Sequence, residues 1–348
     1  MAMSGGVDSS VAAALLMERG YEPVGVTMRL WNEPAEQKRQ GCCSLDDVDD
    51  ARRVADQLGI PHYVMNLKEQ FKENVVDYFV SEYTKGRTPN PCIACNRVMK
   101  FDILLDRARQ LGISKLATGH YARIRREKNR HVLRRGVDAN KDQSYFLFDI
   151  PREKLGRIIF PVGELTKNET RDAAARFGLK TARKPESQEI CFVPDDDYPS
   201  FIEKYAGNIE RGAITTREGD VLGEHEGLPY YTIGQRRRIG VSHPHPLYVT
   251  AIEPDSNRLV VGPEEELYAE RMMLGNLTMQ MQLKDGVELD VQLRYRSGPV
   301  KAAVYFKGGG AEVIFAEPAK AVTPGQAAVF YIGDTVAGGG WIETCSKD

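Results

Sequence analysis

The chain has 348 residues, which at roughly 150 residues per domain predicts two or three domains. Hydrophobic residues make up 42% and charged residues 28% of the chain, a balance typical of globular rather than disordered proteins. The net charge is 47 − 49 = −2, so the chain as a whole is not a basic nucleic-acid-binding protein. The longest apolar run, residues 11–17, is far shorter than the roughly 20 residues that cross a bilayer. No leader pattern begins the chain, so we expect a cytoplasmic protein without membrane contact.

Helix and strand patterns alternate over the first 120 residues. Helices are predicted at residues 9–19, 44–59, 71–83 and 103–111, and strands at 24–30, 62–67 and 115–118. Gly20 and Gly59 provide left-handed C-cap positions, while Ser44 and Asp47 resemble a capping box. Strands separated by helices predict an α/β fold with a mostly parallel sheet covered on both faces. Ligands in such folds bind at the carboxyl ends of the strands.

The second half of the chain changes character. A helix is predicted at residues 167–177, and after residue 195 the chain becomes rich in Gly, Pro and Tyr. From Val287 to Tyr295 apolar and polar residues alternate strictly, and similar runs follow at 300–306, 311–315 and 327–332. Short strands separated by turn residues predict a small β-barrel.

The strongest motif is Ser4-Gly5-Gly6-Val7-Asp8-Ser9-Ser10, between a strand remnant and the start of a helix. Two glycines let the backbone approach a ligand closely, and the serine hydroxyls and first-turn N–H groups supply donors. This arrangement suits an anion such as pyrophosphate. The motif is not a Walker A loop, because no Gly-Lys-Ser/Thr follows it. A capped turn at a helix start is the plainer alternative for a generic Gly-Gly-x-Asp.

The six cysteines are too few for a disulfide scaffold, but their spacing is informative. Cys92 and Cys95 form a C-x-x-C behind two prolines, which predict an inflexible loop presenting both thiols. With the distant Cys191, this spacing indicates metal or redox chemistry, whereas a lone cysteine is more often a small buried hydrophobe. Cys345 is expected to be incidental, and no role is assigned to the adjacent Cys42 and Cys43.

Together these motifs resemble those of the tRNA-specific 2-thiouridylases of the bacterial and organellar type, over nearly the whole chain. The first motif resembles the PP-loop of ATP pyrophosphatases. The others are Gly-Cys-Cys-Ser at 41–44, Gly-Arg-Thr-Pro-Asn-Pro at 86–91, Ala-Thr-Gly-His-Tyr at 117–121, Lys-Asp-Gln-Ser-Tyr-Phe-Leu at 141–147, residues 186–192 and Thr-Ile-Gly-Gln-Arg at 232–236.

The resemblance implies three parts. Residues 1–194 would form the PP-loop (adenine nucleotide alpha hydrolase-like) parallel-sheet domain, residues 195–263 a small central domain that contacts tRNA, and residues 264–348 the C-terminal β-barrel. With only residues 1–3 before the PP-loop, the first strand is shorter than this fold normally has.

The activity implied by the resemblance is the ATP-dependent replacement of the C2 oxygen of the wobble uridine by sulfur, in tRNAs for Lys, Glu and Gln. ATP with Mg²⁺ would adenylate that oxygen. The partners would be the tRNA anticodon loops and a sulfur donor, which is a cysteine desulfurase, a sulfur-relay protein or sulfide. Two alternatives stay open: another PP-loop ligase, similar to lysidine synthetase, and a tRNA-binding module without catalysis.

Site residues are carried over by matching motifs. The nucleotide site would comprise Ser4, Gly5, Gly6, Val7, Asp8, Ser9, Ser10, Met28 and Gly119. The tRNA contacts would be Asn90, Pro91, Cys92, His120, Lys141, Asp142, Gln143, Tyr295, Arg296 and Gln326. Cys95 matches the family's nucleophilic cysteine, and Cys191 matches the cysteine that carries the persulfide.

Cys92 departs from the family pattern, since many members have Asp at this position. Cys92, Cys95 and Cys191 would make a three-thiolate set able to hold a 4Fe–4S cluster with one open iron. We predict this cluster under anaerobic conditions. The persulfide route, which needs only Cys95 and Cys191, remains the alternative.

A local excess of positive charge lies between residues 121 and 141. The cations are Arg123, Arg125, Arg126, Lys128, Arg130, Arg134, Arg135 and Lys141, opposed only by Glu127 and Asp138. A second cluster comprises Arg236, Arg237 and Arg238. A solvated hairpin face is the plain interpretation of the first run, and a tRNA substrate favours RNA contact.

Overall fold

The computed structural model describes residues 1–31, 45–184, 190–193, 197–207 and 209–347. Cys42, Cys43 and the capping residue Ser44 lie outside the described residues. The chain divides into two compact units, and each unit combines segments that are separated in the sequence. The first comprises Met1–Val75, Cys92–Phe192 and Asp334–Val336, and the second Val76–Pro91, Val193–Gly333 and Ala337–Asp348.

A parallel sheet forms the centre of the first unit. Strands β1 (Gly25–Arg29) and β2 (His62–Asn66) pair in parallel, as do β3 (Leu116–Ala117) and β6 (Ile158–Ile159). Residues 1–3 join the two pairs, because Ala2 forms a parallel bridge with Val26 and donates its N–H to the Ala117 carbonyl oxygen at 2.8 Å. The resulting order is β2, β1, residues 1–3, β3, β6. The shortened first strand therefore lies mid-sheet, next to the point where strand order reverses.

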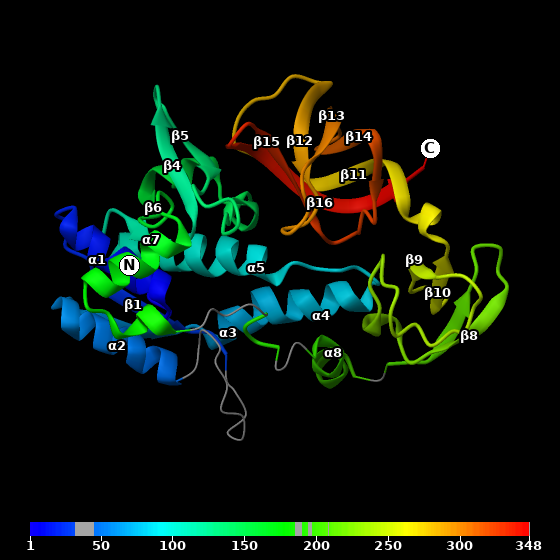
Figure 1. Ribbon diagram of the computed structural model, residues 1–348, viewed down its shortest axis with the longest axis horizontal. Helices are drawn as coiled ribbons and strands as arrows, with labels where there is room; N and C mark the ends of the chain where they lie inside the picture. Colours follow the sequence, from blue (N-terminus) through cyan, green and yellow to red (C-terminus); the bar gives the residue numbers. More distant parts are fainter. Residues whose placement is uncertain (32–44, 185–189, 194–196, 208, 348) are drawn as a thin grey trace. The chain divides into compact units, whose positions relative to one another are not determined.

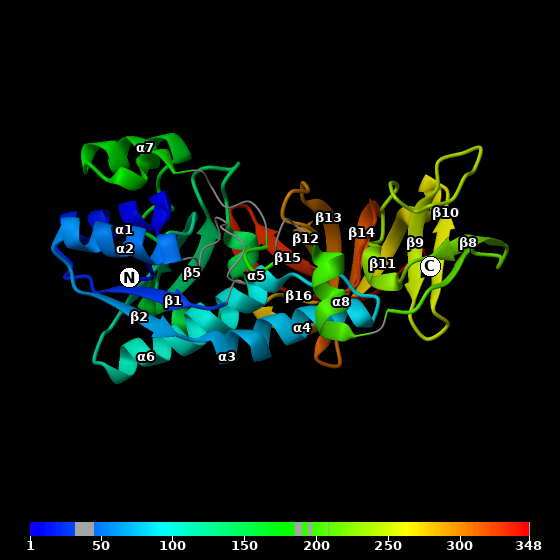
Figure 2. The same cartoon turned by 90° about the horizontal axis from the view of Figure 1, so that it is seen from below.

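Helices cover both faces of this sheet, as predicted (Figure 2). Helices α1 (Val7–Glu18), α2 (Leu45–Leu58) and α7 (Lys167–Arg176) lie on one face, and α3 (Lys68–Phe71) and α6 (Leu105–Gln110) lie on the other. The small side chains of α1 explain its deep burial, since Val11, Ala12 and Ala13 are completely inaccessible. No helix in the described part of the chain combines the length and apolar character needed to cross a membrane.

The predicted helix at 71–83 is longer than expected and contains a π-helical segment. It runs through α3, the π-helix η1 (Lys72–Val76) and α4 (Asp77–Thr84). A second π-helix, η2 (Cys95–Leu104), connects α5 (Pro91–Ala94) to α6. The prediction that an inflexible loop presents Cys92 and Cys95 was therefore wrong, because both residues lie on helical turns. Pro91 begins this helix at the first helical position, where a missing N–H costs nothing.

The basic run forms a β-hairpin of β4 (Ala122–Glu127) and β5 (Arg130–Arg135). Short 3₁₀ helices follow it along the chain, at Ser144–Leu147, Arg152–Arg157 and Lys180–Arg183.

The second unit contains two β structures. Between residues 209 and 263, all of them described, β8 (Val221–His225), β7 (Gly212–Thr215), β10 (Arg258–Gly262) and β9 (Tyr248–Glu253) form a sheet in that order. Helix α8 (Tyr198–Ala206) precedes it, and 3₁₀ turns occupy Leu228–Tyr230 and Glu264–Leu267. The core of the sheet is apolar and includes Ile214, Val249 and Leu259.

The predicted β-barrel is confirmed (Figure 1). Its strands pair in the order β11 (Tyr268–Met279), β14 (Gly310–Lys320), β13 (Val300–Lys307), β12 (Val287–Gln292), β15 (Ala327–Ile332) and β16 (Thr335–Ser346). Pairing of β11 with β16 closes the barrel. Leu289 and Val291, on the predicted apolar face, are buried in its core.

Candidate functional site

Tight contacts between backbone and serine hydroxyls fix the PP-loop, residues 4–10. Gly5 has φ +71°, and a Cβ there would overlap the Asp47 carbonyl oxygen at the start of α2. The Ser9 hydroxyl accepts from the Ser4 N–H at 3.2 Å and donates to the Gly6 carbonyl at 3.0 Å. Gly6 is the N-cap of α1, and no side chain caps the helix. The first-turn N–H groups are thus arranged to receive an anion.

Asp8 of the PP-loop is held by a lysine and a tyrosine. Lys167 Nζ donates to both carboxylate oxygens, at 2.7 and 3.0 Å, and the Tyr121 hydroxyl donates to one of them at 2.8 Å. Lys167 is only 8% exposed and begins α7, whose N-terminus has a complete capping box of Thr166 and Glu169. The sequence interpretation missed Lys167. The capping-box pattern places the start of α7 but does not reveal its partner.

Lys184 fixes the other side of the loop. Its Nζ donates to the Gly5 carbonyl at 3.2 Å and to carboxylate oxygens of Asp47 and Asp50, each at 2.6 Å. Burial by itself would lower the pKa of Lys184, but the two carboxylates outweigh burial and raise this pKa above its usual value. Lys184 was also missed, because these partners lie more than a hundred residues earlier in the chain.

Gly119 lies against the PP-loop, as its predicted role requires. A Cβ on Gly119 would come within 2.7 Å of the Asp8 carbonyl carbon and the Ser9 nitrogen. Because β3 ends just before Gly119, the loop and this glycine meet where strand order reverses, which is the usual ligand position. Met28 lies in β1 and is 9% exposed. Its contact with a nucleotide stays a prediction.

His120 is buried, with both ring nitrogens engaged. Nδ1 lies 2.6 Å from Thr118 Oγ1 and Nε2 lies 3.2 Å from Lys100 Nζ. Because an ammonium can only donate, Nε2 accepts and Nδ1 carries the proton that is donated to Thr118. Burial, and to a smaller extent the charge of Lys100, keep the pKa of His120 well below its ordinary value. The imidazole is therefore neutral at physiological pH.

Cys92 is exposed, while Cys95 and Cys191 are half-buried. Cys95 begins the π-helix η2. The residue after Cys191 is anchored in an aromatic cluster, since the Phe192 ring centroid lies 5.5 Å from that of Phe71 and 6.2 Å from that of Trp31.

Across the described residues, no three or more His, Cys, Asp or Glu side chains are grouped so that they could hold a metal ion. The convergence of Cys92, Cys95 and Cys191 into a 4Fe–4S ligand set therefore stays a prediction, and no step is derived through a cluster.

Among the predicted tRNA contacts of the first unit, Asp142 and Gln143 support the backbone. Asp142 is 6% exposed and accepts hydrogen bonds from Arg135 Nη1 and from the Gly136 N–H, both at 2.9 Å. Gln143 Oε1 accepts from the Tyr121 N–H at 2.9 Å, and Lys141 beside them is half-buried. These residues order the loop that follows the hairpin.

The second unit brings other predicted contacts together. Gln326 Nε2 donates to the Thr88 carbonyl at 2.8 Å, which connects the barrel to the segment containing Asn90 and Pro91. Arg296 is exposed and Tyr295 half-buried. Their binding of tRNA remains a prediction.

Internal ion pairs neutralise about half of the basic hairpin. Arg123 pairs with Asp334 at 2.8 Å, Arg125 with Glu164 at 2.5 Å and Arg135 with Asp142 at 2.9 Å. Arg134 pairs with Glu127. In the described part of the chain, no carboxylate lies within ion-pair distance of the exposed side chains of Arg126, Lys128 and Arg130. The cations available to an RNA backbone are therefore at the tip of the hairpin.

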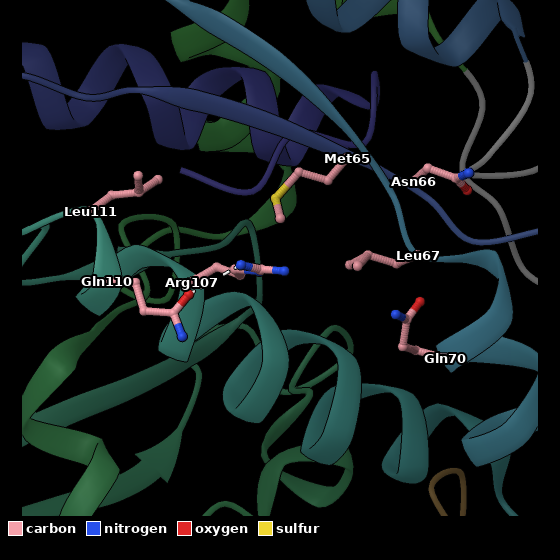
Figure 3. A pocket seen from close by; sticks show the side chains of 7 residues that line it. All are labelled: Met65, Asn66, Leu67, Gln70, Arg107, Gln110 and Leu111. Carbon is pink, nitrogen blue, oxygen red and sulfur yellow. Dashed lines mark hydrogen bonds between the residues drawn. The ribbon is translucent and has the colours of Figure 1, made fainter.

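A separate pocket of about 320 Å³ lies where the edge strand β2 ends (Figure 3). Met65 and Asn66 of β2 line it, together with Arg107 of α6, which donates to Gln110 Oε1 at 3.1 Å. It contains none of the predicted site residues.

Comparisons with known proteins identify the family of the chain. Residues 1–195 match the tRNA methyl transferase HUP domain family, residues 199–263 the tRNA methyl transferase PRC-barrel domain family and residues 265–342 the aminomethyltransferase β-barrel domain family. The chain is 52% identical to the tRNA-specific 2-thiouridylase MnmA of Geobacter metallireducens, over 100% of this chain and 97% of that protein. It is 49% identical to the protein of the same name from Heliobacterium modesticaldum, over 98% and 91%, and 50% identical to that of Moorella thermoacetica, over 100% and 99%. The chain belongs to the family of tRNA-specific 2-thiouridylases.

Proposed function

We propose that this protein uses ATP to convert the wobble uridine of tRNAs for Lys, Glu and Gln into 2-thiouridine. The observation that carries the proposal is the PP-loop at the strand-order reversal, with uncapped N–H groups of α1 and Gly119 against its first turn. The full-length relatives named for this activity support it. The thiol chemistry suits a reducing compartment such as the cytoplasm.

In the first step, the PP-loop backbone and the exposed Ser4 hydroxyl bind the ATP phosphates. Mg²⁺ bound with the nucleotide would shield the phosphate charges. The wobble uridine is unpaired, so moving it into a pocket costs little stacking energy. Its O2 attacks the α-phosphorus, the bond to the β-phosphate oxygen breaks, and pyrophosphate leaves.

Sulfur transfer follows on the two family cysteines. The terminal sulfur of a Cys191 persulfide attacks C2 of the adenylated uridine, and AMP leaves with the former O2. The Cys95 thiolate then attacks Cys191 Sγ, which forms a Cys95–Cys191 disulfide and releases 2-thiouridine. A dithiol reductant and a persulfide donor, a cysteine desulfurase or a relay protein, restore the resting state. Sulfide is the alternative sulfur source.

Contact with the tRNA is proposed for Asn90, Pro91 and Cys92, for Lys141, Asp142 and Gln143, for Tyr295, Arg296 and Gln326, and for the hairpin tip. Gln326 supports the first group through its hydrogen bond to the Thr88 carbonyl. The buried Asp142 supports the second group by ordering its loop.

Cys95→Ser separates the proposal from its alternatives. We expect this variant to form AMP with tRNA but to yield no 2-thiouridine, measured by nucleoside mass spectrometry. A lysidine synthetase-like ligase would be unaffected by the substitution, and a binding module would form no AMP in the wild type.

Iron analysis of anaerobically purified protein tests the persulfide route against the cluster. The persulfide route predicts no stoichiometric iron, and it predicts that Cys92→Asp thiolates tRNA as the wild type does. Iron that is lost in Cys92→Asp together with thiolation would contradict the persulfide route.

A further inference from the structure

Lys100 is a half-buried cation whose partner is a neutral histidine. Its Nζ donates to His120 Nε2 at 3.2 Å, and the imidazole is itself fixed by Thr118. The ring packs between Phe101 and Phe160, with centroid distances of 6.1 and 5.8 Å. This packing leaves the imidazole one orientation, and it therefore fixes the position of the ammonium group.

The other cations around the π-helix η2 have carboxylate partners. Arg97 Nη1 lies 2.5 Å from Asp102 Oδ2, and Lys154 also pairs with Asp102. Within the described residues, no carboxylate lies within ion-pair distance of Lys100. A partly desolvated ammonium without a counter-ion is stabilised by an anionic ligand.

Lys100 is connected to both reactive parts of the site. In a π-helix the hydrogen bonds join residues five apart, so Lys100 lies one turn after Cys95. Its partner His120 directly follows Gly119, whose backbone contacts the first turn of α1 at Asp8 and Ser9. Lys100 is therefore fixed next to the segment that bounds the nucleotide loop, on the helix that presents the nucleophile.

We propose that Lys100 is a catalytic residue that binds the α-phosphoryl group, first of ATP and then of the adenylated uridine, and that His120 is its positioning residue. This inference rests on the proposed function. As O2 bonds to the α-phosphorus and the bond to the β-phosphate breaks, Lys100 donates to a non-bridging α-oxygen. It keeps this contact as sulfur adds to C2 and AMP departs. A preorganised donor of this kind stabilises developing charge without reorganisation.

The test compares Lys100→Met and Lys100→Arg with Lys115→Met. Lys115 is an exposed lysine just before β3 and gives a matched control for loss of one charge. We expect pyrophosphate release by Lys100→Met to fall about 100-fold in kcat, with a much smaller change in KM for ATP. Lys100→Arg should recover part of the rate, and Lys115→Met should match the wild type. Thermal unfolding should be similar in all three variants.

His120 is tested by two substitutions. His120→Gln places an acceptor near the position of Nε2 and should retain more of the rate than His120→Leu, which removes it. Equal losses in two stably folded variants would show that His120 fills space and does not position Lys100.

Three results would overturn the proposal. If Lys100→Met releases pyrophosphate at a rate within a factor of about two of the wild type, Lys100 does not bind the α-phosphoryl group in the reaction. Normal release combined with a shifted pH profile of Cys95 alkylation, followed by peptide mass spectrometry, assigns Lys100 to the Cys95 thiolate instead. No AMP formation by the wild type with any tRNA removes the proposed function and this inference with it, whereas the first two results leave the proposed function intact.

Discussion

The pair of Asp8 and Lys167 gives the most direct test of how the nucleotide loop is stabilised. The Lys167 side chain is 10% exposed and that of Asp8 is 32% exposed, with Nζ–Oδ distances of 2.7 and 3.0 Å. Removing one partner of a buried ion pair costs about 3–5 kcal/mol, because the other charge is left uncompensated. Asp8 is partly hydrated and keeps the Tyr121 hydrogen bond, so Lys167→Met should cost less, about 1–3 kcal/mol.

Asp8→Asn should cost more than Lys167→Met, because it leaves the more buried charge without a partner. For a unit of this size, 2 kcal/mol corresponds to a decrease in Tm of roughly 4–8 °C. The double variant should be more stable than the sum of the two losses predicts, by about 1–2 kcal/mol. Both single variants should also bind ATP poorly, because Asp8 lies in the first turn that receives the phosphates.

Thermal and urea unfolding of the four proteins measures this coupling, and calorimetric titration with ATP measures binding. Losses that simply add in the double variant would show that the ion pair contributes no coupling energy. Full thiolation by Asp8→Ala at saturating ATP would refute the assignment of the loop itself.

Three further predictions follow from other contacts. Gly119→Ala should abolish ATP binding and also reduce stability, since the added Cβ would lie 2.7 Å from the backbone nitrogen of Ser9 and would force the loop to move. ATP titration and thermal unfolding check this, and wild-type affinity would contradict it. Burial lowers the pKa of His225, so the contribution of its neutral imidazole to stability is complete above the ordinary pKa of 6.5 and is lost as the pH falls below that value. The free energy of unfolding of His225→Gln should therefore depend less on pH than that of the wild type. An unchanged pH dependence would refute this. At the hairpin tip, a triple alanine variant should bind tRNA more weakly, and the slope of log K against log[salt] should decrease in magnitude by about 2–3. An unchanged slope would show that this surface is only a solvated face. The residues substituted are Arg126, Lys128 and Arg130.

Local patterns predicted much of the architecture. The alternation from Val287 onward identified the barrel, and the helix pattern at residues 9–19 identified α1 next to the loop. Pro91 was misinterpreted, because a proline before a C-x-x-C is equally compatible with a stiff loop and with the first position of a helix. The π-helices have no sequence signature of comparable strength. Their extra residue per turn depends on packing against neighbouring elements.

The ion pairs were harder to predict than the fold, because the partners of ionisable groups come from distant parts of the chain. Arg123 was expected on a solvated surface, but it pairs with Asp334, which lies 211 residues away in sequence. Arg123→Ala should therefore reduce stability, unlike substitutions at the hairpin tip. Lys167 and Lys184 were missed for the same reason. Neither lies in a motif that reveals its partner, and each acquires its role only when the fold places it against the loop.

The charges around the loop also explain how a loop arranged to receive an anion remains stable. A cluster of cations at a helix N-terminus would be destabilised by mutual repulsion and by the dipole of α1. Two of the three lysines avoid this, because Lys167 is neutralised by Asp8 and Lys184 by Asp47 and Asp50. These three ion pairs fix the loop geometry, and they leave no excess of positive charge from Lys167 and Lys184 beside the helix N-terminus. Lys100 is held by the His120 imidazole, and among the described residues no carboxylate lies within ion-pair distance of it. In the proposed site, the attraction for phosphate therefore comes from the N–H groups of α1 together with the Lys100 ammonium.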